Sequence, residues 1–308
     1  MEPMSLVAAI KGRGPNGYGY GSTAEEVTEG VDLSGKTMLL TGCNSGLGLE
    51  TLRVLGLRGA HVIATARTTD KAMAAITRTG ADATPLECEL SEPESVRACI
   101  ESVRKLDRPL DAIIANAGIM ALPRVERRHG YELQFFTNHV GHFMLVTGLL
   151  DALAPAGRVV VLSSGAHRAA PREGIRFDDL GAEQSYSAWG NYGQSKLANL
   201  LFARTLAKRL GNGGQTANAV HPGVIQTELG RHMSAVARFG MSLGRPLFLK
   251  SIPQGAATQC LLAAHPSVAG VSGEYYADCN PSRPSRLGRD DALAERLWEV
   301  TEQIVARL

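Results

Sequence analysis

The sequence has no long apolar run and no excess of charge of either sign. No stretch of about 18 consecutive apolar residues occurs, so we expect no membrane-spanning helix. The longest early apolar piece, Leu6 to Ile10, is too short for the core of a secretory signal. Lys and Arg number 32 against 30 Asp and Glu, a net charge of +2. The composition therefore does not indicate binding to nucleic acid or to an anionic membrane.

Cysteine is scarce and scattered. The five cysteines are Cys43, Cys88, Cys99, Cys260 and Cys279, an odd number without a Cys-x-x-Cys pair. This pattern argues against a disulfide framework and against a structural zinc site, so we expect no metal. Free thiols are typical of a reducing compartment, and the expected location is the cytoplasm.

The 308 residues contain a regular alternation of short apolar runs and segments of helical period. The runs predict strands at 37–41, 61–65, 84–90, 112–115, 159–162, 216–220 and 274–277. The periodic segments predict helices at 47–58, 71–79, 91–106, 131–153, 192–210 and 254–264. Strands that are apolar on both faces and alternate with helices predict an α/β fold. We expect one doubly wound parallel sheet of about seven strands with helices on both faces.

The domain organisation is simple. Glycine-rich residues 1–33 predict a flexible N-terminal arm that ends in a short helix at 22–30, and residues 34–308 predict a single domain. An apolar insert at 229–250 interrupts the alternation within that domain. It forms either a lid over a substrate or a pair of surface helices packed on the body, and the sequence leaves both open.

A glycine turn follows the first predicted strand and opens the first predicted helix. In this context Gly42 permits a sharp turn, Gly46 lets a pyrophosphate approach the backbone, and Gly48 lets the helix lie close to the strand. The amides at the helix start would then face the anion. The candidate dinucleotide-binding residues of this turn are Gly42, Asn44, Ser45, Gly46, Leu47 and Gly48.

The end of the second predicted strand indicates which dinucleotide binds. An acidic residue there would bind the ribose 2′-hydroxyl of NAD, but the sequence has no carboxylate at this point. Arg67 stands there instead, and it either pairs with the 2′-phosphate of NADP or lies in solvent. The missing acid together with the arginine favours NADP(H).

Two pairs of polar residues are candidates for the chemistry. Tyr192 and Lys196 lie four apart and share one face of a predicted helix. An ammonium beside a phenol favours phenolate and lowers the pKa of the tyrosine from about 10, which makes it a usable proton donor near neutral pH. Ser163 and Ser164 end a predicted strand at the ligand-binding edge of a parallel sheet. A hydroxyl there either holds a substrate oxygen or simply ends the strand.

Two further positions each leave two interpretations open. The stretch 116–118 either lets a cofactor approach the backbone or is only a turn. Asn138 is unusual inside a helix, where it either kinks the helix and binds water or hydrogen-bonds a neighbouring strand.

Taken together, residues 34–280 resemble the short-chain dehydrogenase/reductase family, whose fold is the Rossmann fold. The motifs that carry the resemblance are Thr41-Gly42-x-x-x-Gly46-x-Gly48, Asn116-Ala117-Gly118, Asn138, Ser164, Tyr192-x-x-x-Lys196, and Pro222-Gly223 with Thr227. The stretches NSGLG at 44–48, TNHVGHF at 137–143, SKLAN at 195–199 and HPG at 221–223 are similar to the retinol dehydrogenase and WW-domain oxidoreductase subgroup.

The resemblance implies roles for individual residues. Tyr192 would be the catalytic acid/base, and Lys196 would bind the nicotinamide ribose and tune Tyr192. Ser164, rather than Ser163, would hold the reacting oxygen, and Asn138 would support a water of the proton relay. The further cofactor contacts that it implies are Glu89, Leu90, Asn116, Ala117, Gly118, Tyr192, Lys196, Pro222, Gly223, Val224, Ile225 and Thr227.

The sequence departs from the family pattern at three places. Ala115 stands where the family often has asparagine, although the turn is kept. Glu89 replaces the frequent aspartate near the adenine, so this longer acid either shifts the adenine contact or points elsewhere. The gap between Ser164 and Tyr192 is longer than the family minimum and resembles the longer loop of retinol dehydrogenases, which we expect to shape the pocket. It contains His167, Phe177 and Trp189.

The predicted function is that of an NADP(H)-dependent oxidoreductase, which transfers a hydride between nicotinamide and an alcohol or carbonyl substrate. Methionines and phenylalanines in the insert at 229–250 indicate an apolar substrate. The alternative is a catalytically silent NADP(H)-binding regulator or scaffold on the same fold. The resemblance also implies that a homodimer could form through the helices at 131–153 and 192–210.

Overall fold

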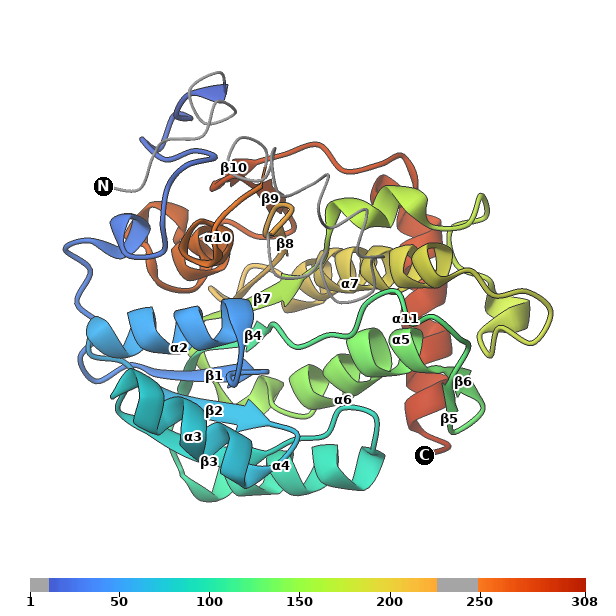
Figure 1. Cartoon of the computed structure of the whole chain (residues 1–308), viewed down its shortest axis with the longest axis horizontal. Helices are drawn as coiled ribbons and strands as arrows, with labels where there is room; N and C mark the ends of the chain where they lie inside the picture. Colours follow the sequence, from blue (N-terminus) through green and yellow to red (C-terminus); the bar gives the residue numbers. More distant parts are fainter. Residues whose placement is uncertain (1–10, 226–248) are drawn as a thin grey trace, which may run out of the picture.

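An eight-stranded sheet forms the centre of the computed structural model, which describes residues 11–225 and 249–308 (Figure 1). Its strands are β1 Thr37–Thr41, β2 His61–Ala66, β3 Ala83–Glu87, β4 Leu110–Ala115, β7 Leu153–Leu162, β8 Thr216–His221, β9 Tyr275–Ala277 and β10 Asn280–Pro281. They lie in the order β10-β9-β8-β7-β4-β1-β2-β3. Each neighbouring pair is parallel except β9 and β10.

The predicted doubly wound α/β sheet is confirmed, with one strand more than the seven expected. The extra strand is β10, which has two residues and returns antiparallel to β9. The chain reverses at Asp278 and Cys279, whose φ angles of 52° and 62° are both positive. A strand this short carries no apolar run, so hydrophobic periodicity does not mark it.

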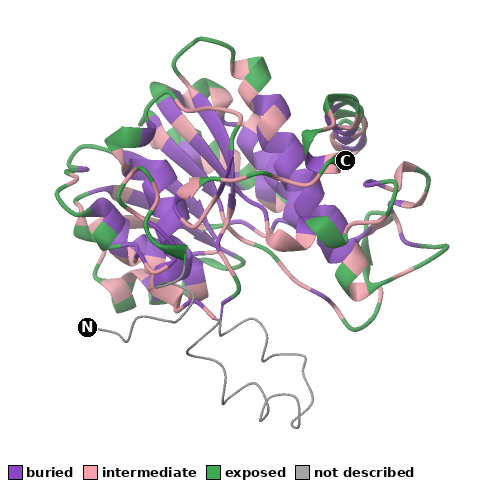
Figure 2. Cartoon of the chain, turned by 90° about the horizontal axis from the view of Figure 1, so that it is seen from above, coloured by how far each residue is buried: buried purple, intermediate pink, exposed green. Residues whose placement is uncertain are grey.

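Helices cover both faces of the sheet and enclose two separate cores (Figure 2). One layer consists of α2 Gly46–Leu57, α3 Thr69–Thr79 and α10 Ile252–Ala264. The other consists of α4 Pro93–Lys105, α6 Gly141–Thr147 and α7 Ala188–Leu210, with α11 Asp291–Val305 packed on α7. Side chains of β1 alternate between the layers: Leu39 belongs to the core of α7, and Met38 and Leu40 to that of α2.

Short elements complete the described chain. They are the 3₁₀ turns η1 Glu26–Thr28, η3 Leu150–Ala152, η4 Gly165–Ala169, η5 Phe177–Asp179, η6 Pro266–Val268 and η7 Leu287–Arg289, and the hairpin of β5 Arg127–Arg128 and β6 Tyr131–Glu132. Within residues 11–225 and 249–308, no helix combines the length and the apolar character needed to cross a membrane.

The helix predicted at 131–153 is shorter and interrupted. It begins as α5 Leu133–Phe135, continues as the π-helical turn η2 Phe136–Val140, and ends with α6 at Thr147. The π-helical turn contains Asn138, whose side chain binds the backbone of Ile119 in the neighbouring loop. A polar side chain bound outside the helix is consistent with this local widening, a feature common at functional sites.

The C-terminal helix α11 was not predicted. Its Trp298 packs against Phe143 and Phe202, with ring centroids 4.8 and 5.7 Å apart, and the guanidinium of Arg209 lies 4.4 Å from the indole centroid. The helix thus covers part of α6 and α7. The resemblance implied that a homodimer could form through these elements, and this part of their surface is already covered within the chain.

The described part of the N-terminal arm has contacts with the body of the protein. Lys11 forms an ion pair with Asp278 at 2.8 Å, and Asn16 Nδ2 donates to the carbonyl of Cys279 at 2.6 Å. Tyr20 is buried. The expected short helix at 22–30 is the single turn η1, and the Thr23 hydroxyl accepts from the Glu26 amide at its start at 3.2 Å. Long-range contacts thus join the arm to the β9–β10 turn.

Candidate active site

The loops that carry the predicted motifs emerge from one edge of the sheet. β1, β4, β7 and β8 are parallel neighbours, so their carboxyl ends open on the same side (Figure 1). The chain winds in opposite directions from β1, toward β2 on one side and toward β4 on the other. Ligands of doubly wound folds bind at such a switch point.

The glycine turn has the close packing that the sequence predicted. A Cβ added at Gly48 would lie 2.0 Å from the carbonyl oxygen of Gly42, so the first turn of α2 rests directly on the loop. Asn116 Nδ2 donates to the Thr41 carbonyl at 2.7 Å and holds the loop from the β4 side. Asn116 therefore supports the turn through its side chain.

The start of α2 fits a dinucleotide phosphate. Ser45 occupies the N-cap position without a side-chain capping bond, so it leaves the first-turn amides to another acceptor. A Cβ added at Gly46 would meet nothing within 4 Å, and Asn44 and Ser45 are exposed. Arg67 is exposed just beyond the end of β2. The start of α2 therefore has room for an anion. The cationic side chain of Arg67 follows β2, the strand next to β1.

Three residues that the resemblance assigned to the cofactor have other surroundings. The Glu89 carboxylate accepts from the amide and the hydroxyl of Ser91 at 3.1 and 3.0 Å. Leu90 is buried, and its carbonyl lies 2.2 Å from a Cβ added at Gly141. Ile225 is also buried, where it packs beside α10.

The two serines after β7 have different partners. Ser163 is buried, and its hydroxyl donates to the carbonyl of Lys196 at 2.7 Å, which ties the strand to α7. Ser164 is partly exposed, and its hydroxyl accepts from the Ala166 amide at 3.2 Å. That contact leaves the proton of Ser164 available to a substrate oxygen. The geometry therefore supports the choice of Ser164 for the reacting oxygen.

Close packing places Tyr192 and Lys196 at the same edge. A Cβ added at Gly193 would lie 2.7 Å from the carbonyl oxygen of Ala166, so α7 rests on the turn that follows Ser164. Lys196 is buried, and its Nζ donates to the Leu162 carbonyl at 3.0 Å. The same ammonium lies 5.8 Å from the centroid of the Tyr192 ring. A cation at this distance stabilises negative charge on the phenol.

Asn138 positions the loop after β4. Its Oδ1 accepts from the Ile119 amide at 2.8 Å, and its Nδ2 donates to the Ile119 carbonyl and to Ser195 Oγ, both at 2.9 Å. A Cβ added at Gly118 would lie 3.1 Å from Asn138 Oδ1 and 3.4 Å from Lys196 Nζ. The structure thus brings Gly118, Asn138 and Lys196 together. The support of a relay water by Asn138 stays a prediction.

Two histidines that were not predicted as catalytic or cofactor-binding residues hold the backbone of Ser164 and Gly165. His167 Nδ1 donates to the Ser164 carbonyl at 2.7 Å, while its Nε2 accepts from the Ser285 amide at 3.0 Å. His221 Nδ1 accepts from the amide of Gly165 at 3.0 Å. No short-range pattern predicts the contacts of His167 with Ser285 and of His221 with Gly165, since these residues are far apart in the sequence.

Two residues of the stretch after β8, Gly223 and Val224, are accessible at the edge. Pro222 is buried, and Gly223 donates its amide to His221 Nδ1 at 3.3 Å. Val224 is 51% exposed. Thr227 and most of the insert predicted at 229–250 lie outside the described residues.

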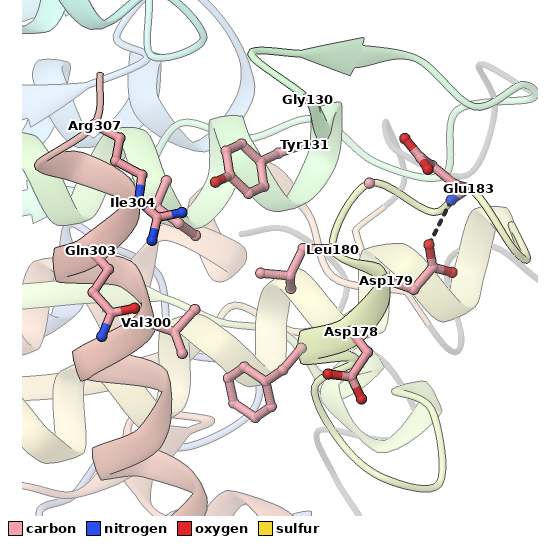
Figure 3. A pocket seen from close by; sticks show the side chains of 12 residues that line it. Gly130, Tyr131, Asp178, Asp179, Leu180, Glu183, Val300, Gln303, Ile304 and Arg307 are labelled. Atoms are coloured by element: carbon pink, nitrogen blue, oxygen red, sulfur yellow. Dashed lines mark hydrogen bonds between the residues drawn. The ribbon is translucent and has the colours of Figure 1, made fainter.

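A pocket of about 270 Å³ lies elsewhere, between η5, the β5–β6 hairpin and α11 (Figure 3). Asp178, Leu180 and Ile304 are among its lining residues, and Phe177 of the predicted pocket-shaping loop faces it. None of the predicted site residues lines this pocket. We therefore place the candidate active site at the sheet edge.

Comparison with known proteins identifies the family. Residues 36–176 match the family model of short chain dehydrogenases. The short-chain dehydrogenase TIC 32 B, chloroplastic, of Brassica napus is 43% identical over 99% of this chain and 100% of its own length. The chain belongs to the short-chain dehydrogenase family. The resemblance stated from the sequence is therefore confirmed.

The subgroup is confirmed as well. Retinol dehydrogenase 14 of Homo sapiens is 38% identical over 90% of this short-chain dehydrogenase and 88% of its own length. The WW domain-containing oxidoreductase of Homo sapiens is 36% identical over 94% of this chain and 72% of its own length. A crystal structure of an uncharacterized protein from Mycobacterium Paratuberculosis superposes with a TM-score of 0.74 at 32% identity, covering 91% of this chain and 97% of that one.

The buried histidines of this short-chain dehydrogenase predict a loss of stability in mild acid. Burial lowers the pKa of His142 and His221 from 6.5 to about 4, and that of His139 to about 3. Because these pKa values are depressed in the folded state, the unfolded chain binds more protons once the pH falls below about 6.5. Folding stability is therefore complete above that pH and declines as the pH falls toward 4.

Urea titrations at pH 7 and pH 5 measure this loss. Each histidine contributes about 2 kcal/mol to the difference in the free energy of unfolding. Replacing His221→Asn keeps an acceptor for the Gly165 amide and removes one titrating group, so the difference shrinks by about one such share. An unchanged difference in this variant would contradict the assignment.

Proposed function

We propose that the protein is an NADP(H)-dependent oxidoreductase that interconverts an apolar alcohol and its carbonyl compound, with Tyr192 as the acid/base. The observation that carries this proposal is the anchoring of Lys196 at the end of β7, 5.8 Å from the Tyr192 ring centroid, on a helix that packs on the turn after Ser164. The enzymatic names of the similar proteins support catalysis over the silent regulatory alternative.

The residues at the start of α2 would hold the cofactor. The first-turn amides and the open space at Gly46 suit the pyrophosphate, and the exposed Arg67 suits a 2′-phosphate. Lys196 and Gly118 would border the nicotinamide ribose. When bound, the nicotinamide supplies or accepts the hydride, which is the hard part of the chemistry.

The side chains of the protein then bind the substrate oxygen and transfer its proton. In reduction, Ser164 Oγ donates a hydrogen bond to the carbonyl oxygen, and the Tyr192 hydroxyl delivers a proton to it. The ammonium of Lys196 stabilises the phenolate that remains. In oxidation the same groups act in reverse, and the phenolate takes the proton of the alcohol.

The cellular setting follows from the thiols and from the cofactor. We propose the cytoplasm as its location, because five free cysteines are typical of a protein in a reducing compartment. NADP(H) there is held largely reduced, which favours reduction of the carbonyl compound as the working direction.

Replacing Tyr192→Phe tests the proposed acid/base. The phenylalanine keeps the ring and removes the proton donor, so turnover of NADPH with an aldehyde substrate falls by about 10²- to 10⁴-fold. NADPH binding, measured by fluorescence titration, stays close to that of the wild type. Retention of most of the turnover would show that another group moves the proton.

Alanine variants of the neighbouring residues Ser163 and Ser164 form a matched pair for comparison. Ser164→Ala removes a donor to the substrate oxygen, so kcat falls by about 10²-fold or more while stability is kept. Ser163→Ala removes the buried bond to Lys196, so the free energy of unfolding falls by about 1 kcal/mol and kcat falls far less. Steady-state kinetics and urea unfolding of both variants provide the readout. The reverse pattern would assign the substrate contact to Ser163.

Charge reversal at Arg67 tests the cofactor preference. Arg67→Asp removes the partner of the 2′-phosphate and adds repulsion, so the ratio of kcat/KM for NADPH over NADH falls by about tenfold or more. Arg78→Asp makes the same charge change at an exposed position in the last turn of α3 and serves as the control. An equal ratio in wild type and Arg67→Asp would mean that Arg67 does not select the cofactor.

A further inference from the structure

Trp189 is a large apolar side chain held at the edge of the candidate active site and left partly in solvent. It is 49% exposed, and in the described chain only Leu57, Met73 and Val224 are other large hydrophobic residues of this kind. Leu57 ends α2 at the opposite edge of the sheet, whereas Val224 follows β8 at the same edge as Tyr192. Two of these four side chains therefore flank the reacting edge.

Trp189 lies directly beside the proposed acid/base. Its indole meets the Tyr192 ring edge-to-face, with centroids 6.0 Å apart and an interplanar angle of 79°. Tyr192 is buried, so the exposed part of the indole continues outward from the position of the phenol. When the carbonyl oxygen of a substrate contacts Tyr192 and Ser164, the rest of the substrate extends either along Trp189 or away from it.

The first turn of α7 holds Trp189 in place. Ser187 caps the helix by accepting from the Gly190 amide at 3.3 Å, and its own amide donates to Asn191 Oδ1 at 3.1 Å. Tyr186 donates its hydroxyl to the Leu122 carbonyl at 2.7 Å, which ties this turn to the loop after β4. The indole is thus presented on a pre-organised element, which reduces the entropy cost of using it for binding.

We propose that Trp189 is the specificity-determining residue of this site and binds the apolar chain or ring attached to the reacting carbonyl. This inference rests on the proposed function and adds to it a preference for carbonyl compounds with a long apolar substituent. Burial of exposed indole surface by such a substituent is favourable in proportion to the area covered. A short carbonyl compound reaches Tyr192 without covering the indole and gains nothing from it.

Reduction of butanal and dodecanal with NADPH tests the preference. The wild type has the higher kcat/KM for dodecanal. Trp189→Ala lowers that value by about tenfold, mainly through KM, and changes kcat/KM for butanal by less than about twofold. Trp189→Phe, which keeps an aromatic ring, retains most of the dodecanal activity. Leu57→Ala removes an equally exposed apolar side chain far from the edge and leaves both substrates unchanged.

An equal loss for both aldehydes in Trp189→Ala would overturn the proposal, because it would mean that Trp189 acts only through Tyr192 or on the fold. No loss for either aldehyde would overturn it as well.

A second readout is independent of turnover. The chain has two tryptophans, and Trp298 is buried, so a ligand at the edge changes the emission of Trp189 selectively. Dodecanamide, whose carbonyl is not reduced, changes the tryptophan emission of the wild type and leaves that of Trp189→Phe unchanged. An equal response in both proteins, or a response in neither, contradicts the inference.

The two readouts separate the inference from the proposed function. A wild type that reduces neither aldehyde but shows the Trp189-dependent emission change would refute the proposed reaction and support Trp189 as the apolar binding surface. A wild type that reduces butanal and dodecanal equally well, with no emission change, would support the reaction and refute the role of Trp189.

Discussion

The arrangement of the site depends on how the end of β7 is joined to α7. Ser163 donates to the backbone of Lys196 at 2.7 Å, and Lys196 returns its ammonium to the backbone of Leu162 at 3.0 Å. These two bonds run in opposite directions between the same strand end and the same helix turn. They fix a buried cation at the strand end, one helical turn from Tyr192. The bond to the Leu162 carbonyl offsets part of the cost of desolvating the buried ammonium.

The loops around this pair are held by polar side chains that point inward. Asn138 binds the backbone of Ile119, Asn116 binds that of Thr41, and His167 and His221 bind that of Ser164 and Gly165. The two histidines can play this part because burial lowers their pKa, so each keeps a neutral ring. A neutral imidazole offers one donor and one acceptor nitrogen, and His167 uses both. The reactive side chains thereby sit on backbone that cannot shift easily.

The elements that could be predicted from the sequence are those that depend on local pattern. The apolar runs located the seven parallel strands, because burial on both faces leaves a signal in neighbouring residues. The glycine turn located the start of α2, because close backbone packing requires glycine. The interruption of the helix at Asn138 and the helix α11 left no such signal. Each of these depends on contacts with residues distant in the sequence. The contacts of Lys11 and Asn16 left no local signal either, since their partners are Asp278 and Cys279.

Membership of the short-chain dehydrogenase family and the geometry of the edge support the same account, in which the backbone positions the groups and a bound nicotinamide provides the hydride. The measurement that tests this most directly is the fate of a deuterium label placed at the transferable position of NADPH. The account predicts that the wild type moves the label to the former carbonyl carbon of the product alcohol, as seen by mass spectrometry. Product alcohol that forms without the label would contradict it.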